Sequence, residues 1–476
     1  MIALAVVVGA PAAGAVVAAG VPGRVRPVVG AMTSALTGVA AAALAWQGWR
    51  EAAPRRVAVP APAETEFVLV ADGLAIAMVL MTAVVGCAAS AFAVLERGDA
   101  RGGHRAYWPL WLALWAGLHV LFLAGDLFTA YLMLELVGIC GAALVMLGGK
   151  QRVIVAGARY FYAELVASIT FLLGLALVWA EAGTLEFAAL PGELIATPAG
   201  QWGVAAMTAG LLLKVPLVPL HFWLPGAHAL APGTVSPILS AVVVKSAFAV
   251  GVRLWFLAVP GALTMPTAQL LGALGAVAVL WGSLNALRAQ QIKVLIAHST
   301  LAQLGLLFLL PPLVQAGAAG GWSGGVLHAI VHALPKAAVL MVAAVLARAA
   351  GTERLDGLAG TAAHRPLGAF ALGAAAVSLV GLPPSGGFVA KWYLLEASLA
   401  TGQWWWAVVI VAGTLLTAGY LLRLVRPAFT APPTGSPVRA SRPASDVVAL
   451  VLALAAVVLG LRPTELLELV AVGAPL

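Results

Sequence analysis

Charged residues are scarce in this sequence. Only 9% of the 476 residues are Asp, Glu, Lys or Arg, whereas 62% are hydrophobic. Soluble domains carry about 25% charged residues, so the composition excludes a soluble globular protein. The 52 glycines and 29 prolines agree with this, because both residues are more frequent in membrane helices than in soluble ones. We therefore expect an all-α polytopic membrane protein in a lipid bilayer.

Cysteine is almost absent as well. Cys87 and Cys140 are the only two, and both fall within apolar runs. An iron–sulfur cluster takes four ligands, so two isolated thiols cannot hold one. The chain also has no CxxC and no GxGxxG at a strand–helix junction. We expect no cofactor in this chain.

The net charge of +8 does not indicate nucleic-acid binding. The basic residues lie in short loops between apolar runs and form no basic stripe. This pattern is typical of residues that set membrane topology. We expect no nucleic-acid partner.

The apolar runs are long enough to cross a bilayer, which takes about 20 mostly apolar residues. The first run lacks a preceding basic segment and is longer than the apolar region of a signal peptide, which favours a first span over a cleaved signal. We predict about 14 spans, at residues 2–22, 28–46, 68–95, 107–125, 127–148, 155–181, 202–222, 235–258, 266–287, 292–312, 323–348, 367–395, 403–425 and 446–461.

The loop charges predict an orientation, because cytoplasmic loops carry an excess of Lys and Arg. If the N-terminus faces outward, the inner loops hold 17 basic residues and the outer loops hold 5. We therefore expect both termini on the outer side of the cell inner (plasma) membrane. The inner residues are Arg24, Arg26, Arg97, Arg101, Arg105, Lys150, Arg152, Arg159, Arg288, Lys293, Arg348, Arg354, Arg365, Arg423, Arg426, Arg439 and Arg442; the outer ones are Arg50, Arg55, Arg56, Arg253 and Arg462.

Four basic residues remain, and all are lysines inside predicted spans. A charge there costs about 2.5–3.5 kcal/mol and usually faces the bundle interior or a water-filled path. One lysine could extend to the membrane surface, but four on four different spans make that reading poor. A buried lysine can release its proton, whereas arginine stays protonated, so the pattern indicates proton transfer. The four are Lys214, Lys245, Lys336 and Lys391.

Two spans carry helix-breaking residues beside a lysine. Lys214 is followed by Pro216 and Pro219, and Lys391 is preceded by GLPPSGG, residues 381–387. Proline breaks a helix, and loose backbone inside a bilayer must be buried in protein or line a wet cavity. Alternatively, the prolines only shape packing.

Paired broken spans are typical of inverted-repeat transporters. The broken spans are the seventh and the twelfth, five helices apart, which predicts two inverted five-helix repeats, spans 4–8 and 9–13. The expected domains are 1–106 (flanking spans 1–3), 107–260 (first repeat), 261–425 (second repeat) and 426–476 (a loop and span 14).

Carboxylates are rare at membrane depth. Glu135 is the only one in the middle of the fifth span, and Glu164 lies a turn or two inside the sixth. A lone buried carboxylate needs a partner, and we expect Glu135 to pair with Lys214. At 4 Å such a pair is worth roughly 4 kcal/mol, so opening it would change how tightly Lys214 holds its proton.

Histidines follow in the second half. His298 lies in the polar cluster of IAHSTLAQLG, and His328, His332 and Lys336 recur every four residues, on one helical face. An HxxxH pattern could bind metal, but there is no HExxH and no third ligand nearby, so we expect no metal. A single histidine is often structural. A stripe of two with a lysine favours a proton relay, since His titrates near neutrality.

Four blocks of the chain resemble a known family. They are KVPLVPLHFWLPGAHALAPGTVSPILSAVVVKSAFAVGVRL, RAQQIKVLIAHSTLAQLG, LHAIVHALPKAAVLM and GLPPSGGFVAKWYLL. In this order they are similar to the proton-conducting antiporter-like membrane subunits of complex I, of Mrp-type sodium/proton antiporters and of membrane-bound hydrogenases. The resemblance covers about residues 68–425 and implies a fold of fourteen helices with two inverted repeats.

The resemblance also implies roles for single residues. Glu135, Lys214 and Lys245 match the family's glutamate and lysines on the fifth, seventh and eighth helices. His298 and the region of His332 match polar residues of the central axis, and Lys391 matches the exit residue on the twelfth helix. Lys336 matches no position that the family assigns. Residues 67–86 and 183–190 most resemble the D-type member of the Mrp antiporters.

We therefore expect a proton-translocating subunit of a multisubunit membrane complex, most similar to a cation/proton antiporter. Its partners would be other membrane subunits, and its cargo protons and possibly sodium. The alternative is a subunit of a complex I-like NADH:quinone oxidoreductase or a membrane-bound hydrogenase. A stand-alone symporter and an inert scaffold are weaker alternatives, and a scaffold has no use for four buried lysines.

Overall fold

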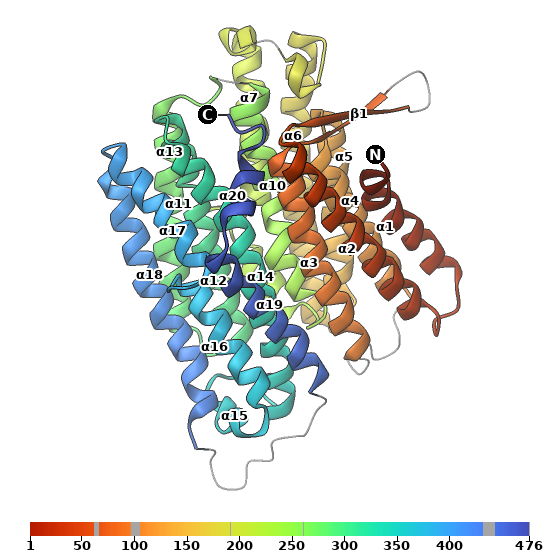
Figure 1. Ribbon diagram of the computed structural model, residues 1–476, viewed down its shortest axis with the longest axis vertical. Helices are drawn as coiled ribbons and strands as arrows, with labels where there is room; N and C mark the ends of the chain where they lie inside the picture. The colour runs from red at the N-terminus through yellow and green to blue at the C-terminus, as the bar shows by residue number, and fades with distance from the viewer. Residues whose placement is uncertain (61–65, 97–104, 191, 260, 432–442, 476) are drawn as a thin grey trace.

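The chain folds into one bundle of long helices (Figure 1). The computed structural model describes residues 1–475 except 61–65, 97–104, 191, 260 and 432–442, so the predicted inner residues Arg97, Arg101, Arg439 and Arg442 lie outside the described residues. The helices of ten residues or more are α1 (Ile2–Gly20), α2 (Arg26–Glu51), α3 (Gly73–Leu95), α4 (Tyr107–Leu123), α5 (Leu127–Met146), α6 (Gln151–Ala182), α7 (Pro198–Lys214), α10 (Val244–Arg253), α11 (Met265–Arg288), α12 (Ile292–Leu307), α14 (Ala319–Ala350), α16 (Pro366–Val380), α17 (Gly386–Ala400), α18 (Trp404–Val425) and α19 (Ala444–Leu461).

Shorter elements connect or extend these helices. The α-helical ones are α8 (Leu224–Leu230), α9 (Ser236–Ile238), α13 (Leu310–Gln315), α15 (Thr361–His364) and α20 (Thr464–Ala471). Two π-helical segments, η4 (Leu239–Val243) and η5 (Leu254–Ala258), flank α10. The 3₁₀ turns are η2 (Phe187–Ala189), η3 (Gly192–Ala196), η6 (Asp356–Leu358) and η7 (Arg426–Phe429), and the strands are β1 (Arg55–Pro60) and β2 (Glu66–Ala71).

Within the described residues, 11 helical segments are long and apolar enough to cross a membrane, or 12 if one bent pair counts as a span. The chain is thus a helical polytopic membrane protein, as predicted. The predicted spans not among the eleven are 107–125, 202–222 and 367–395. Helix α4 has only 17 residues, and the other two regions are broken, α7 ending at Lys214 and α16 at Val380.

The prediction of an all-α chain is wrong in one place. Strands β1 and β2 form an antiparallel hairpin in which Arg55 pairs with Ala71 and Val57 with Leu69. Alternating valines suit a strand, and they overrule the apolar continuity that placed residues 68–71 in the third span. Helix α3 begins only at Gly73, where the Asp72 carboxylate accepts a hydrogen bond from the Ala75 N–H at 2.8 Å.

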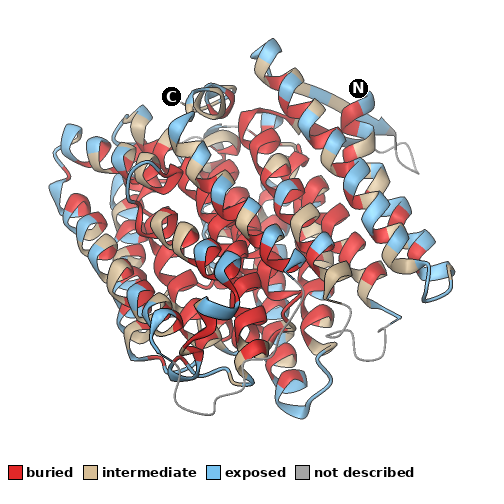
Figure 2. Cartoon of the chain, turned by 60° about the horizontal axis from the view of Figure 1, so that its bottom comes forward, coloured by how far each residue is buried: buried red, intermediate tan, exposed pale blue. Residues whose placement is uncertain are grey.

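Helix α14 is the centre of the molecule. Every residue from Gly324 to Leu346 is buried, and the buried residues gather in the middle of the bundle in Figure 2. It packs against α3, α12, α16, α17 and α19. A helix that is buried on all sides carries its polar side chains into the protein interior whichever face they occupy.

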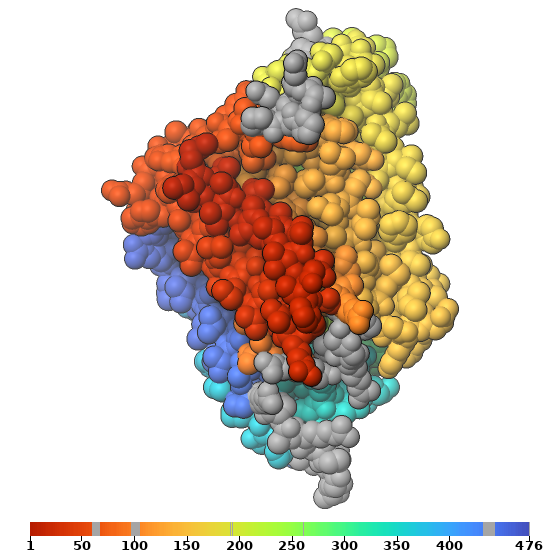
Figure 3. Space-filling model, turned by 90° about the vertical axis from the view of Figure 1, so that its right-hand side faces the viewer, coloured from red at the N-terminus to blue at the C-terminus, as the bar shows by residue number. Residues whose placement is uncertain are grey.

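Helices α1 and α2 form an outer layer, drawn in red in Figure 3, which rests on α3 and α4. The imidazole of His119 on α4 is fully buried between two partners. Its Nδ1 lies 2.9 Å from the Val7 carbonyl of α1, and its Nε2 accepts from the Trp115 indole at 2.8 Å. This histidine therefore fastens α1 to α4.

Two arginines that we counted among the loop charges are in fact buried. Arg253, in the last turn of α10, lies 2.8 Å from Asp72. Arg365, at the start of α16, lies 2.7 Å from Asp446 on α19. Counting charges along the sequence does not reveal the direction of a side chain. These two ion pairs join flanking helices to the bundle.

We predict that Asp72→Asn destabilises the protein by about 3 kcal/mol or more, because Arg253 would be left as an unpaired buried charge. Asparagine keeps an oxygen for the Ala75 N–H, so the helix cap survives. Thermal unfolding in detergent measures the change. Asp356→Asn is the matched control, since Asp356 pairs with Arg354 on the surface, and it should leave the melting temperature unchanged. Equal melting temperatures for the two variants would contradict the prediction.

Candidate functional site

Lys214 shares its ammonium group between two carboxylates. It is the last residue of α7, and its Nζ lies 2.8 Å from Glu164 Oε2 on α6 and 3.5 Å from Glu135 Oε1 on α5. The Ser168 hydroxyl donates a hydrogen bond to the same Glu135 oxygen. The predicted contact with Glu135 is present, but Glu164 is the closer partner.

The local sequence explains where Lys214 sits. Helix α7 ends there because Pro216 and Pro219 follow, and the Trp223 indole donates to the freed Leu213 carbonyl at 3.0 Å. Helix α7 also lies very close to α6, since a β-carbon at Gly210 would be 2.5 Å from the Ala167 carbonyl. The close approach brings the end of α7 against the carboxylate of α6.

The three charges are buried to different degrees. The side chains of Lys214, Glu164 and Glu135 are 4%, 11% and 26% exposed. With both carboxylates ionised the cluster would carry one excess negative charge, which is costly at this depth unless a further proton or cation joins it. Glu135 already has Ser168 as a second partner. Lys214 thus has both carboxylates within 4 Å, with Glu164 the nearer one.

Lys245 is completely buried on α10. Its ammonium donates to the Ala241 carbonyl, one turn back, within the π-helical segment η4. Such segments are frequent at functional sites because their wider turn changes the backbone hydrogen bonding. No carboxylate pairs with Lys245 among the residues that the structure describes.

Lys336 is also completely buried, on α14. Its Nζ lies 2.5 Å from the Ser299 hydroxyl and 3.4 Å from the Ile296 carbonyl, both on α12. Its partners are therefore neutral oxygens. The sequence singled out Ser299 only as part of a polar cluster, and the structure makes it the direct contact of a lysine.

His328 and His332 stack on one face of α14, with ring centroids 5.9 Å apart. His328 Nε2 lies 3.3 Å from the Gln303 carbonyl. His328 Nδ1 and His332 Nε2 are buried without a hydrogen-bond partner in the described part of the chain. His332 is near enough to Lys245, Lys336 and Lys391 to interact electrostatically with all three.

His298 is placed differently. It is only partly buried, and it interacts electrostatically with His221, in the break after α7. No hydrogen bond or ring contact joins it to His328 or His332 among the described residues. The structure thus brings His298 to the broken helix rather than to the stripe of α14.

Lys391 lies in the second turn of α17 and points back at the end of α16. Its Nζ donates to the Val380 carbonyl at 2.7 Å and reaches the Leu379 carbonyl at 3.3 Å. Gly381 ends α16 with a φ of +83°, and a β-carbon there would lie 2.8 Å from Lys391 Cδ. The carboxyl end of a helix favours a cation, so the second break holds Lys391 by backbone carbonyls.

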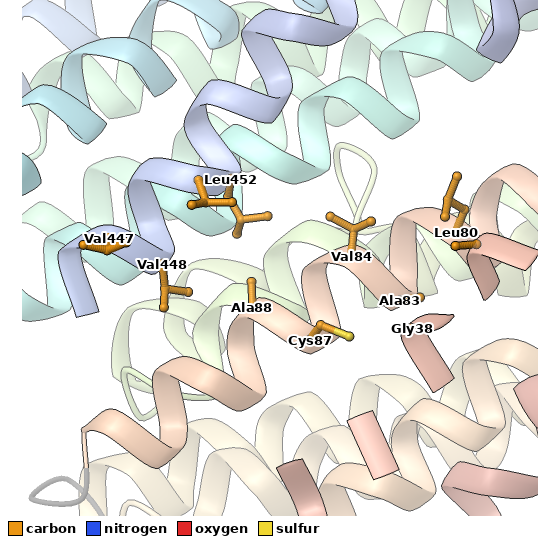
Figure 4. Close-up of a pocket in the computed structure, with 11 residues that line it drawn as sticks. Gly38, Leu80, Ala83, Val84, Cys87, Ala88, Val447, Val448 and Leu452 are labelled. Atoms are coloured by element: carbon orange, nitrogen blue, oxygen red, sulfur yellow. The ribbon is translucent and has the colours of Figure 1, made fainter. Parts of the chain in front are cut away.

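One cavity near the flanking helices takes no part in this chemistry. It measures about 470 Å³ and lies between α2, α3 and α19. Figure 4 shows its lining of alanine, valine and leucine, with Cys87 as the one sulfur-bearing side chain. The Cys87 thiol is 3.1 Å from the Ser34 carbonyl. An apolar groove at membrane depth suits acyl chains or another helix and offers nothing that carries a proton.

Glu164 is the main residue that sequence reasoning left without a role. The sequence already marked Glu164 as a candidate, because it is a carboxylate inside an apolar span. Spacing along the chain does not show which of two carboxylates on neighbouring helices faces a lysine on a third. The described residues contain no group of three or more His, Cys, Asp or Glu side chains placed to hold a metal.

Comparison with known proteins places this arrangement in context. The N subunit of the NADH-quinone oxidoreductase of Desulforudis audaxviator is 33% identical over 419 residues, which cover 84% of this chain and 83% of that protein. The D subunit of the Na(+)/H(+) antiporter of Bacillus subtilis is 29% identical over 367 residues, 76% of this chain and 73% of that protein.

Chains of two solved membrane complexes have the same fold as this chain. A chain of the Mrp complex from Dietzia sp. superposes with a TM-score of 0.89 at 25% identity, covering 99% of this chain and 97% of that one. A chain of the respiratory complex I from Thermus thermophilus superposes with a TM-score of 0.76 at 25% identity, covering 98% of each. The model of the family described as NADH:quinone oxidoreductase/Mrp antiporter, TM matches residues 124–417, and the chain belongs to this family.

Proposed function

We propose that this chain is the proton-translocating, antiporter-like subunit of a multisubunit membrane complex, in the first place an Mrp-type cation/proton antiporter. The TM-score of 0.89 against the chain of an Mrp complex supports this reading. The second candidate is a proton-pumping subunit of a complex I-like assembly. The higher sequence identity, 33%, to the N subunit of an NADH-quinone oxidoreductase supports that one.

The observation that carries the proposal is the burial of four amines. Counted over the whole residue, Lys214 and Lys391 are 5% exposed, and Lys245 and Lys336 are fully buried. Three of the four have no carboxylate partner among the described residues, only hydroxyl or carbonyl oxygens. An unpaired buried ammonium is expensive, so such a lysine can also exist as the neutral amine. Alternation between these two forms is what a proton carrier needs.

The route that we propose runs along the middle of the bundle. Protons enter by a half-channel near Lys214 or Lys245, pass Lys336 and the two stacked histidines, and leave by Lys391. The electrostatic interactions of His332 with three of the lysines support its inclusion in this route. The unpaired ring nitrogens of His328 and His332 support a hydrated path, because buried polar atoms without a protein partner usually bind water. His298 is not on this route; in the proposal it is a polar residue beside the break after α7.

Glu135 and Glu164 set the proton affinity of Lys214 in this proposal. When Lys214 moves from one carboxylate to the other, or loses both, its ammonium form becomes more or less stable. A charge change in a neighbouring subunit would drive this exchange. The Ser168 hydroxyl stabilises Glu135 while Lys214 is held by Glu164.

The finer architecture belongs to the same proposal. We infer fourteen spans, with inverted repeats at spans 4–8 and 9–13 and the domain limits given above. The two breaks support this, since one ends α7 at a lysine and the other places the end of α16 on a lysine. Both termini lie toward the same end of the bundle in Figure 1 and are inferred to face outward from the bias of loop charges.

Replacing Lys214 or Lys391 by alanine should abolish proton transport by the reconstituted complex. Lys391→Arg should abolish it as well, because arginine keeps the charge but does not release its proton. A pH-sensitive dye in proteoliposomes measures transport. Arg288→Ala, at an exposed helix end, is the control and should transport like the unaltered complex. Normal transport by both alanine variants would overturn the proposed relay.

Replacing Glu164 by glutamine should slow transport about tenfold or more, the equivalent of losing a hydrogen bond to a charged group of about 1.5–3 kcal/mol. Without this carboxylate the ammonium of Lys214 loses its nearer partner, so proton transfer through Lys214 should be slower. Glu135→Gln leaves the 2.8 Å contact in place and should slow transport less. Transport that is slowed only by Glu135→Gln would show that Glu164 has a merely structural role.

The co-purifying subunits decide between the two assemblies. Small membrane subunits without redox centres are expected for the antiporter. Flavin and iron–sulfur proteins in the purified complex would instead show that the chain belongs to a complex I-like assembly. The relay proposed for this chain would be the same in either complex.

A further inference from the structure

A second, much larger cavity opens at one end of the bundle, among the ends of several long helices. It has a volume of about 920 Å³. Its walls come from the starts of α2, α4, α6 and α12, the ends of α3 and α14, and the segment 229–235. Its described lining includes neither Lys214 nor the two carboxylates that hold it, and the proposed relay does not use it.

The charges of this cavity are strongly one-sided. Its described lining holds five basic side chains and only two acidic ones. The basic ones are Arg26, Lys150, Arg152, Lys293 and Arg348, and the acidic ones are Glu96 and Glu353. Arg348 pairs with Glu96, and Lys293 lies 3.8 Å from Glu353. Both carboxylates are therefore already engaged.

Lys150 and Arg152 have no ion pair or side-chain hydrogen bond within the described residues. They occupy the first turn of α6, with Lys150 at the N-cap, where no side chain caps the free N–H groups. Cations are unfavourable at the positive end of a helix, and an anion is favourable there. An anion in this cavity would satisfy both lysine and arginine as well as the free N–H groups.

Tyr107 adds an independent sign of a ligand. Its ring lines the cavity, and its hydroxyl oxygen is buried without a hydrogen bond of good geometry. Its polar neighbour is Thr234, which also lines the cavity. A phenolic hydroxyl can accept a hydrogen bond from a neighbouring threonine and still donate its own proton to a bound anion.

The surroundings indicate what kind of anion fits. The cavity lies where membrane-spanning helices end, and Trp108, Leu147 and Val153 give it an apolar wall beside the basic one. Aromatic residues at helix ends mark the membrane interface, and basic pockets between helices there suit phospholipid headgroups. All five basic residues belong to the loops and helix ends that the charge bias assigns to the inner side.

We propose that this cavity is a binding site for the phosphodiester headgroup of an anionic phospholipid of the inner leaflet. Lys150 and Arg152 bind the phosphate, and the Tyr107 hydroxyl donates to it. Arg26, whose guanidinium is already fixed by the Val21 and Arg105 carbonyls, supplies further positive charge. The site does not depend on proton transport, so it stands or falls by a binding measurement alone.

The test is titration of the full chain, purified with its partner subunits in neutral detergent, with dioctanoyl phosphatidylglycerol. Dioctanoyl phosphatidylcholine and inorganic phosphate are the comparison ligands. The Lys150→Gln/Arg152→Gln variant should bind phosphatidylglycerol about 30-fold more weakly, near fivefold for each charge removed. Raising the salt concentration should weaken binding to the unaltered chain. The zwitterionic lipid should bind far more weakly to every form.

Arg288→Gln/Arg426→Gln is the matched control. It also removes two positive charges, from exposed helix ends that do not line the cavity, and it should leave the affinity unchanged. An equal loss of phosphatidylglycerol affinity in both double variants would show that only the general surface charge matters, and it would overturn the proposed site. Inorganic phosphate binding as tightly as the lipid would make it a site for free phosphate instead. Unchanged lipid binding with loss of co-purifying subunits would make it a docking site for an acidic protein segment.

Discussion

A charged amine inside a bilayer must be solvated by the protein that carries it, and much of this fold follows from that constraint. Regular helices offer no free hydrogen-bonding groups, so oxygens must come from irregular backbone or from polar side chains. The end of α16 supplies two carbonyls to Lys391, and the π-helical segment η4 supplies one to Lys245. The wide turn and the second break thus supply the hydrogen-bond acceptors that water would otherwise give to Lys245 and Lys391.

The four lysines are not equivalent, and in the proposed relay their differences would decide where control acts. Lys214 faces two carboxylates, whereas the other three face neutral oxygens. Coulomb interactions between full charges are the strongest ones available at this depth. A change in the charge near Lys214 therefore alters the stability of the ammonium form more at Lys214 than at any later lysine of the route. The interior of α14, where His332 interacts with three lysines, is where that change would be felt next.

The sequence predicted the helices, the two breaks and the buried amines because each depends on residues close together in the chain. Lys214 and Pro216 are neighbours, and the stripe of His328, His332 and Lys336 follows from helical periodicity. Contacts between helices were not accessible in this way. Which carboxylate lies nearest to Lys214, and which residue accepts from Lys336, depends on how α6, α7, α12 and α14 are packed.

The β-hairpin was missed for a related reason, since hydropathy does not separate a valine-rich strand from the start of a span. Helix α3 begins after Asp72 because the Asp72 side chain caps the helix, and the same side chain pairs with Arg253, 181 positions away in the chain.

The choice between lysine and arginine separates structure from function in this molecule. The described residues bury six basic side chains, two of them arginines, and each arginine lies within 3 Å of an aspartate. Arginine stays protonated and binds a carboxylate with two parallel donors, which suits a permanent fastening between helices. Three of the four buried lysines, in contrast, have no acid beside them in the described part of the chain. A chain that needed only fixed charges could have used arginine throughout. Its use of lysine wherever the counter-ion is missing is what a relay of exchangeable protons requires.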